Sequence, residues 1–172
     1  MKIIYFAGFG GIKSSETFQN ILEKYPDSIF IKYDNINANR AFEQIEVQLS
    51  CLSIVNHIIV GQSLGGFWAE YFANKYNCSL VLINPSLKPY ESLVKYNLEE
   101  ADLESYRKYK ISKNSQSKVS LIVSKYDQTV NPDYAIFRYK GVTDIKYIDS
   151  DHKLNEFDTL FAEIKIRIEN DF

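Results

Sequence analysis

Six short apolar runs recur along the chain, each separated from the next by a longer segment of mixed polarity. The runs cover residues 3–6, 28–33, 57–61, 79–84, 118–124 and 144–149. They are rich in Ile, Val and Leu and show no clean alternation with polar residues, which is typical of strands covered on both faces. The pattern therefore predicts a mainly parallel sheet of about six strands.

Three of the intervening segments carry apolar residues at helical spacing, so that each forms a stripe along one side of a helix. The stripes are Phe42, Ile45, Leu49 and Leu52; Leu64, Phe67, Trp68, Tyr71 and Phe72; and Phe157, Leu160, Phe161, Ile164 and Ile168. Strands that alternate with helices predict an α/β fold with helices on both faces of the sheet. We expect a single domain over residues 1–172.

Residues 85–117 interrupt this alternation, because they are rich in Lys, Glu, Tyr and Ser. We expect one or two helices there, over residues 90–96 and 99–109. The segment is a candidate small cap over a site, but it is too short for a large lid domain. The fold should therefore have a minimal lid or none.

The composition narrows the class of protein. The chain has 172 residues, of which 45% are hydrophobic, and a net charge of −2 without a basic run, which argues against a nucleic-acid binder. The two cysteines, Cys51 and Cys78, form neither a metal-binding pair nor a disulfide framework, so we expect two buried thiols in a reducing compartment. No signal-peptide pattern or membrane-length apolar stretch is found, which predicts a cytoplasmic protein.

The stretch GQSLG places Ser63 between Gly61 and Gly65, where an apolar strand turns into a helical pattern. A sharp turn of this kind holds the serine backbone in a strained conformation, and side chains at the two glycines would clash. The strain projects the hydroxyl outward at the carboxyl end of a strand, where ligands bind in parallel α/β sheets. Ser63 is therefore a candidate nucleophile.

A serine nucleophile needs a base, and the chain has only two histidines. His57 stands at the amino end of the strand that leads to Ser63, on the wrong side of the sheet. His152 follows the last predicted strand, so it lies at a carboxyl end. We expect His152 to be the base.

The base needs an acid to orient it, and three aspartates are candidates. Asp127 follows the strand at 118–124 and comes from a strand of its own, which makes it the best candidate. Asp149 and Asp151 share the loop of His152, and we expect them to stabilise the turn and to cap a helix that begins near Leu154. The chain order of serine, aspartate and histidine is that of the α/β-hydrolases.

An oxyanion hole completes such a site. One donor is expected to be the backbone N–H of Leu64, the residue after the nucleophile. The other is expected from the loop AGFGG at residues 7–11, whose glycines allow close backbone approach, and we assign it to the N–H of Phe9.

With these residues in place, the chain resembles the α/β-hydrolases, and specifically the small YqiA-like bacterial esterases, over nearly its whole length. The resemblance is carried by IIYFAGFGG, GQSLGGFWAEYFA, VLINPSLKPYESL, VSKYDQTVNPDYA and DHKLNEF. The asparagine-proline turn with KPYESL is more specific than the serine turn, which many hydrolases share. The family implies a compact domain in which Ser63, Asp127 and His152 are nucleophile, acid and base.

These observations predict a serine hydrolase that cleaves esters or thioesters of small acyl substrates through an acyl-enzyme, without a metal or cofactor. One alternative is a carboxylesterase that acts on a methyl-esterified acyl chain on acyl carrier protein in biotin synthesis. That enzyme would need a basic rim for the acidic carrier, and the candidate cap contains Lys88, Lys95, Arg107, Lys108 and Lys110. The other alternative is a non-catalytic binding domain that kept the fold.

Overall fold

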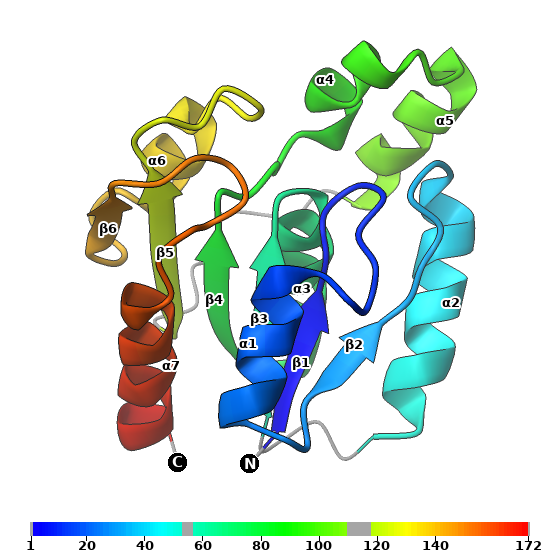
Figure 1. Ribbon diagram of the computed structural model, residues 1–172. Coiled ribbons are helices and arrows are strands. Elements are labelled where there is room, and N and C mark those ends of the chain that lie inside the picture. The colour runs from blue at the N-terminus through cyan, green and yellow to red at the C-terminus, as the bar shows by residue number, and fades with distance from the viewer. Residues whose placement is uncertain (1, 53–56, 110–117, 172) are drawn as a thin grey trace.

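The computed structural model describes residues 2–52, 57–109 and 118–171. Its centre is one sheet of six parallel strands in the order β2-β1-β3-β4-β5-β6 (Figure 1). The strands are β1 (Lys2–Phe6), β2 (Ile29–Ile31), β3 (His57–Gln62), β4 (Ser79–Ile83), β5 (Val119–Ser124) and β6 (Ile145–Ile148). Each strand lies within or overlaps one of the six apolar runs, so the predicted α/β fold with a parallel sheet is confirmed.

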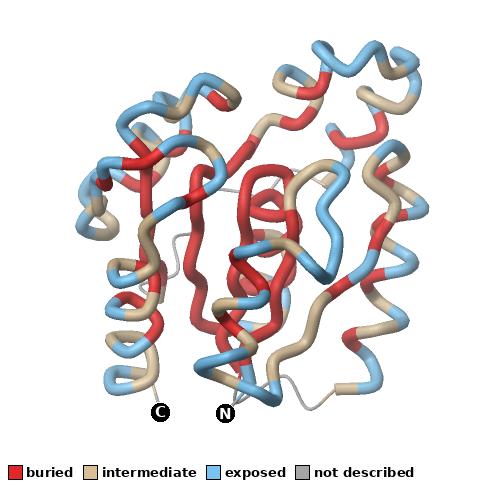
Figure 2. The backbone as a smooth tube through the Cα atoms, viewed as in Figure 1, coloured by how far each residue is buried: buried red, intermediate tan, exposed pale blue. Residues whose placement is uncertain are grey.

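Helices cover both faces of the sheet (Figure 1). On one face lie α1 (Glu16–Lys24) and α7 (Asp158–Asp171), and on the other lie α2 (Ala38–Ser50), α3 (Leu64–Tyr76) and α6 (Asp133–Tyr139). Alternate strand residues supply the two cores: Ile3 and Tyr5 pack with α1 and α7, whereas Ile4 and Phe6 pack with α2 and α3. Because both faces are covered, β3, β4 and β5 are buried at every position (Figure 2), which explains their unbroken apolar runs.

The described part of the candidate cap, residues 85–109, lies beyond the carboxyl end of the sheet (Figure 1) and is called the cap segment below. It contains α4 (Pro89–Ser92), the 3₁₀ turn η2 (Val94–Tyr96), α5 (Glu100–Ser105) and the 3₁₀ turn η3 (Tyr106–Tyr109). The two expected helices are thus shorter and broken, and Asn97 ends η2 in the left-handed conformation with φ 53°. Residues Leu93 and Tyr106 anchor the segment in the core.

Two local expectations are wrong. The last helix begins at Asp158 instead of near Leu154, because Leu154 itself has a left-handed backbone, with φ 66°, that cannot start a helix. Cys78 is a buried thiol, and burial raises its pKa to about 11, but Cys51 is exposed at the end of α2.

No helix in the described ranges is long and apolar enough to cross a membrane.

The strand order places a crevice at one end of the sheet. From β1 the chain passes through α1 to β2 at the sheet edge, and it then returns through α2 to β3 on the other side of β1. The connections that follow β1 and β3 therefore leave in opposite directions. Ligands bind at such a switch point in open α/β sheets, beyond the carboxyl ends of the strands.

Gly65 lets α3 start directly against β1. A Cβ atom at this position would overlap the carbonyl oxygen of Phe6 and come within 2.5 Å of that of Ala7. Gly65→Val should therefore abolish most soluble protein or strongly lower the thermal unfolding midpoint, since the obstacle is backbone of a central strand. Circular dichroism melts check this result.

Gly141→Ala is a matched control for the Gly65 variant. A Cβ atom at Gly141 meets nothing within 4 Å, so the only expected cost is the left-handed backbone, with φ +77°, at about 1–2 kcal/mol. If Gly65→Val melts at the temperature of the wild-type protein, the proposed close approach of α3 to β1 is wrong.

Candidate active site

Ser63 stands between β3 and α3 in the strained conformation expected from the sequence, with φ 54° and ψ −124°. Hydrogen bonds to the next strand and its connection hold this turn. The N–H of Ser63 donates to the carbonyl of Ile83 at 3.0 Å, and its own carbonyl accepts from the N–H groups of Gly66 and Ser86, both at 2.9 Å. Because the backbone is fixed from several sides, the hydroxyl has a defined place at the carboxyl end of the sheet.

The glycine loop, residues 7–11, passes directly beside Ser63. A Cβ atom at Gly8 would come within 2.9 Å of the Ser63 Cβ and 3.3 Å of its Oγ, so only a glycine permits this approach. The connection after β2 holds the loop: the Tyr33 hydroxyl donates to the carbonyl of Ala7, and the Gly10 N–H donates to Asn35 Oδ1 at 2.6 Å. The loop that carries Phe9 is thus fixed next to the serine.

The start of α3 lies beneath Ser63. Leu64 is the first residue of this helix, and the first N–H groups of a helix have no intrahelical acceptor. The helix dipole also favours negative charge at this end. The Leu64 N–H is therefore suited to hold an oxyanion that forms on a carbonyl bound at Ser63.

His152 and Asp127 meet beyond the ends of β6 and β5. The His152 Nδ1 and Asp127 Oδ2 atoms lie 2.7 Å apart, and the Asp127 side chain is only 3% exposed. The second carboxylate oxygen of Asp127 accepts the N–H groups of Thr129 at 2.7 Å and Val130 at 3.0 Å. The carboxylate is thereby fixed in the orientation that meets the imidazole.

These contacts determine the charge of the aspartate. Burial by itself raises the pKa of Asp127, but the hydrogen bonds from His152, Val130 and Thr129 together outweigh it and hold the pKa below its ordinary value. The carboxylate is therefore ionised at neutral pH and only accepts hydrogen bonds. Nδ1 of His152 must carry a proton, which leaves Nε2 of the neutral ring free to accept one.

The lowered pKa predicts a loss of stability in acid. The pKa of an aspartate in the unfolded chain is about 3.9. A carboxyl whose pKa is lower than this in the folded protein stabilises the fold at every pH above the unfolded pKa. This contribution is lost as the pH falls through the folded pKa. The unfolding free energy of the wild-type protein should thus approach that of Asp127→Asn below about pH 4. Urea titrations of both proteins in this range check it, and a constant difference down to about pH 2 would contradict it.

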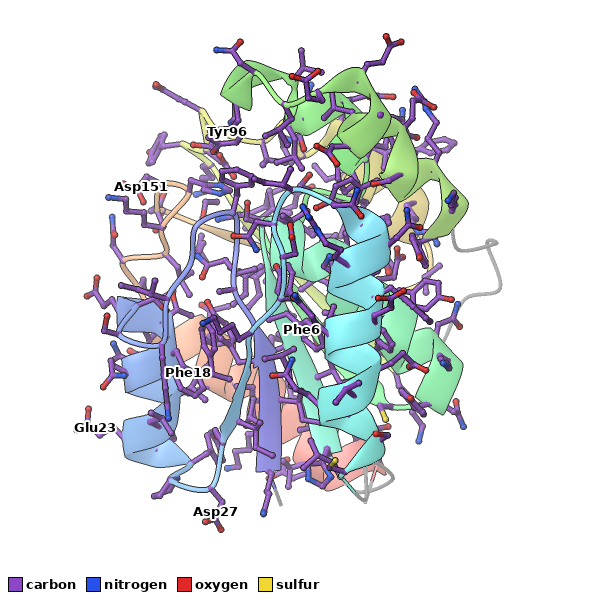
Figure 3. The ribbon with its side chains drawn as sticks, turned by 90° about the vertical axis from the view of Figure 1, so that its right-hand side faces the viewer. Phe6, Phe18, Glu23, Asp27, Tyr96 and Asp151 are labelled. Carbon is purple, nitrogen blue, oxygen red and sulfur yellow. The ribbon has the colours of Figure 1, made fainter. Side chains whose placement is uncertain are left out.

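One cavity of about 460 Å³ contains both Ser63 and His152 in its wall, together with the glycine loop and the start of α1. On the side of the cap segment, Phe9 stacks on Tyr96 with the ring centroids 4.2 Å apart. Figure 3 labels Tyr96 and Asp151, which both lie at this end of the molecule. The serine and the histidine thus line one pocket large enough for a small organic substrate.

The two rival aspartates have partners other than the His152 ring. Asp149 is an exposed partner of Lys125, at 3.0 Å, and Asp151 accepts the N–H of Lys153 at 2.8 Å in a local turn. Among the described residues, the carboxylate bonded to the His152 ring is Asp127. The expected helix cap at these positions is wrong, since Glu156 instead accepts the N–H of Thr159 at the start of α7.

Other expectations concern His57 and metal ions. His57 lies at the amino end of β3, at the opposite end of the strand from Ser63, as its position in the sequence indicated. Within the ranges that the structure describes, no group of three or more His, Cys, Asp or Glu side chains is arranged to hold a metal ion.

Sequence reasoning assigned no role to three residues that lie at this site: Gln62, Asn84 and Tyr96. The signals for the first two were faint, namely the position of Gln62 directly before Ser63 and the asparagine-proline turn that contains Asn84. For Tyr96 no signal existed, because its stacking on Phe9 joins segments far apart in the chain.

The parallel sheet, the strained serine turn after β3, and the aspartate and histidine after β5 and β6 define a member of the α/β-hydrolase superfamily. The chain belongs to the uncharacterised protein family UPF0227, whose family model matches residues 2–167. This match confirms the resemblance to the YqiA-like proteins. No curated protein sequence matches the chain.

Solved structures show the same fold at low sequence identity. The mouse alpha/beta hydrolase domain-containing protein 10 is 16% identical, with a TM-score of 0.73 over 99% of this chain and 89% of that chain. A structure from the metagenome-derived lipolytic enzymes LipS and LipT is 13% identical, with a TM-score of 0.73 over 99% of this chain and 94% of that chain. Est1E from Butyrivibrio proteoclasticus is 13% identical, with a TM-score of 0.71 over 98% of this chain and 87% of that chain.

Proposed function

We propose that the protein is a serine hydrolase that cleaves carboxylic esters or thioesters of small acyl substrates. The observation that carries this proposal is the 2.7 Å hydrogen bond between His152 and Asp127 beside a cavity whose wall also holds Ser63 on its strained turn. The description of one similar structure, which names lipolytic enzymes and the lipase and esterase families, agrees with ester hydrolysis.

The proposed reaction has two steps. In the first, Nε2 of His152 takes the proton of Ser63 as Oγ attacks the acyl carbonyl. The N–H groups of Leu64 and Phe9 stabilise the oxyanion, and the alcohol or thiol leaves with the proton from His152. In the second, His152 takes a proton from water, which attacks the acyl-enzyme, and the acid is released as Ser63 recovers its proton.

Asp127 acts through the imidazole. Its ionised carboxylate holds Nδ1–H and stabilises the positive charge that forms on the ring when Nε2 is protonated. None of these steps uses a metal or an organic cofactor. We also propose that the protein is cytoplasmic, as its sequence leads us to expect.

The alternative of an acyl-carrier substrate has weaker support. Two of the candidate basic residues are paired with acids on the same segment, Lys88 with Glu91 at 3.1 Å and Arg107 with Glu104 at 2.6 Å. Lys95 donates to the carbonyl of Thr129 at 2.7 Å, and Lys110 lies outside the described residues. Lys108 donates to the uncharged Oδ1 of Asn39 at 3.3 Å. The cap segment also carries five acids, Glu91, Glu99, Glu100, Asp102 and Glu104, against four basic residues, so it lacks the uniform positive field that an acidic carrier favours.

A fluorophosphonate probe tests the proposal against a non-catalytic domain. Labelling of the wild-type protein at Ser63, mapped by peptide mass spectrometry, together with hydrolysis of p-nitrophenyl esters or acyl-CoAs, would support a serine hydrolase. A methyl-esterified acyl chain on acyl carrier protein, assayed beside them, separates the carrier alternative. A folded protein that reacts with neither the probe nor any of these substrates would overturn the proposal.

A further inference from the structure

We propose that Gln62 and Asn84 are positioning residues, which hold the backbone of His152 so that its ring faces Ser63. This inference rests on the proposed function, in which His152 is the base. It concerns the histidine loop, defined here as residues 149–157, between β6 and α7.

The histidine loop has little regular structure of its own. It consists of turns and bends, and Leu154 has a left-handed backbone. The contact of His152 with Asp127 fixes the ring through Nδ1 but does not by itself fix the backbone of His152. A base in such a loop needs a second point of attachment.

Gln62 supplies one attachment from the end of β3. Gln62 is 9% exposed, and its Nε2 donates to the carbonyls of His152 at 3.3 Å and Lys153 at 3.2 Å. The other end of the same amide, Oε1, accepts the hydroxyl of Tyr5 at 2.7 Å, which fixes its orientation. Because Gln62 directly precedes Ser63, it joins the strand that carries the candidate nucleophile to the loop that carries the candidate base.

Asn84 supplies the other attachment from the end of β4. It is 3% exposed, and Nδ2 donates to the carbonyls of His152 at 3.3 Å and Asp151 at 3.4 Å. A reciprocal pair of bonds with Ser124 orients this amide: Nδ2 donates to Oγ at 2.9 Å, and Oδ1 accepts the N–H at 2.7 Å. Asn84 has φ 43°, a backbone that asparagine tolerates better than most residues.

Two amides from neighbouring strands thus converge on one carbonyl, that of His152, while Asp127 holds the ring from β5. Individually these bonds are long, but they act on the same short segment from different directions. Proton transfer depends steeply on geometry, and a displacement of about 1 Å costs on the order of 10²-fold in rate. Loss of an amide donor should therefore lower the chemical step more than substrate binding.

Isosteric acids remove the amide donors and keep the size of each side chain and one acceptor oxygen; Asn84→Asp also removes the donor to Ser124 Oγ. Gln62→Glu keeps the acceptor for the Tyr5 hydroxyl, and Asn84→Asp keeps the acceptor for the Ser124 N–H and tolerates a positive φ. In each variant a carboxylate then faces carbonyl oxygens, which repel it. Gln19→Glu is the matched control, because Gln19 is exposed on α1 and its amide donates to the carbonyl of Lys13 and not to a carbonyl of the histidine loop.

The first readout is kinetic, at about pH 8 and with the folded fraction of each variant measured. Gln62→Glu and Asn84→Asp should each lower kcat about 10- to 100-fold with KM within about twofold of the wild type. Gln19→Glu should keep both constants. A kcat within about twofold of the wild type in both variants, or a rise in KM alone, would overturn the inference.

The second readout does not depend on catalysis. In proton NMR spectra, the Nδ1–H of His152, which a carboxylate holds, should give a downfield resonance. Asp127→Asn should remove this resonance. The resonance should broaden or disappear in Gln62→Glu and Asn84→Asp and persist in Gln19→Glu. If it stays sharp in both, the amides do not position the ring. A wild-type protein that shows the resonance but neither hydrolyses esters nor reacts with the fluorophosphonate would contradict the proposed function alone.

Discussion

Ser63→Ala should lower ester hydrolysis by about 10⁴-fold or more while leaving the fold intact. Removal of the nucleophile from a triad leaves only the residual catalysis of the oxyanion hole and of substrate binding. Alanine and serine have similar difficulty with the positive φ at this position, and the three backbone hydrogen bonds of residue 63 do not use the side chain. The rate should therefore fall without a matching fall in the unfolding temperature.

Ser120→Ala provides the matched control. Ser120 is a buried serine on β5, and its hydroxyl has no hydrogen-bond partner in the part of the chain that the structure describes. It lies toward the amino end of the strand, away from the cavity. Its loss should leave kcat unchanged, and fluorophosphonate labelling should disappear in Ser63→Ala alone. A Ser63→Ala protein that turns over esters at the wild-type rate would exclude the acyl-enzyme mechanism.

Asp127→Asn should lower kcat by roughly 10⁴-fold with little change in KM. An asparagine in this place still accepts the N–H groups of Thr129 and Val130, so the local turn should persist. The amide group, however, presents a donor to Nδ1 of His152 and favours the ring tautomer whose Nε2 already carries a proton. That tautomer cannot accept the proton of Ser63, and no negative charge remains to stabilise the imidazolium.

Asp149→Asn and Asp151→Asn separate this effect from a general change in the loop. The salt bridge between Asp149 and Lys125 is exposed, so its loss should cost little in stability or rate. Asp151→Asn keeps an oxygen that can accept the N–H of Lys153. The three variants should be compared at one pH with their melting curves recorded. Near-wild-type activity of Asp127→Asn beside an inactive Asp149→Asn or Asp151→Asn would require a different acid.

Much of the fold was predictable because its signals are local. An apolar run without alternation reports a strand covered on both faces, and the six runs correspond to the six strands. The turn around Ser63 was equally local, because two glycines at a strand-to-helix junction describe a backbone that excludes side chains. Two of the shorter helices were less clear: α1 and α6 bury few residues and carry no long stripe.

Local signals failed where the backbone departs from a regular conformation. The last helix was expected to begin near Leu154, behind a cap at Asp149 or Asp151, but the left-handed backbone of Leu154 delays it to Asp158. Asn97 divides the cap segment in the same manner, with φ 53° at the end of a 3₁₀ turn. A positive φ at a residue other than glycine is stabilised by the surrounding structure, so composition alone does not report it.

The sequence by itself determined the α/β class, the strained turn of Ser63 and the order of serine, aspartate and histidine, because hydrophobic periodicity and glycine chemistry act over a few residues. Only the tertiary structure decided that Asp127 meets His152, that Phe9 stacks on Tyr96, and that the amides of Gln62 and Asn84 converge on one carbonyl. Each of these contacts joins different strands or loops. Their geometry depends on strand order and register, which are set by the packing of the whole sheet and its helices.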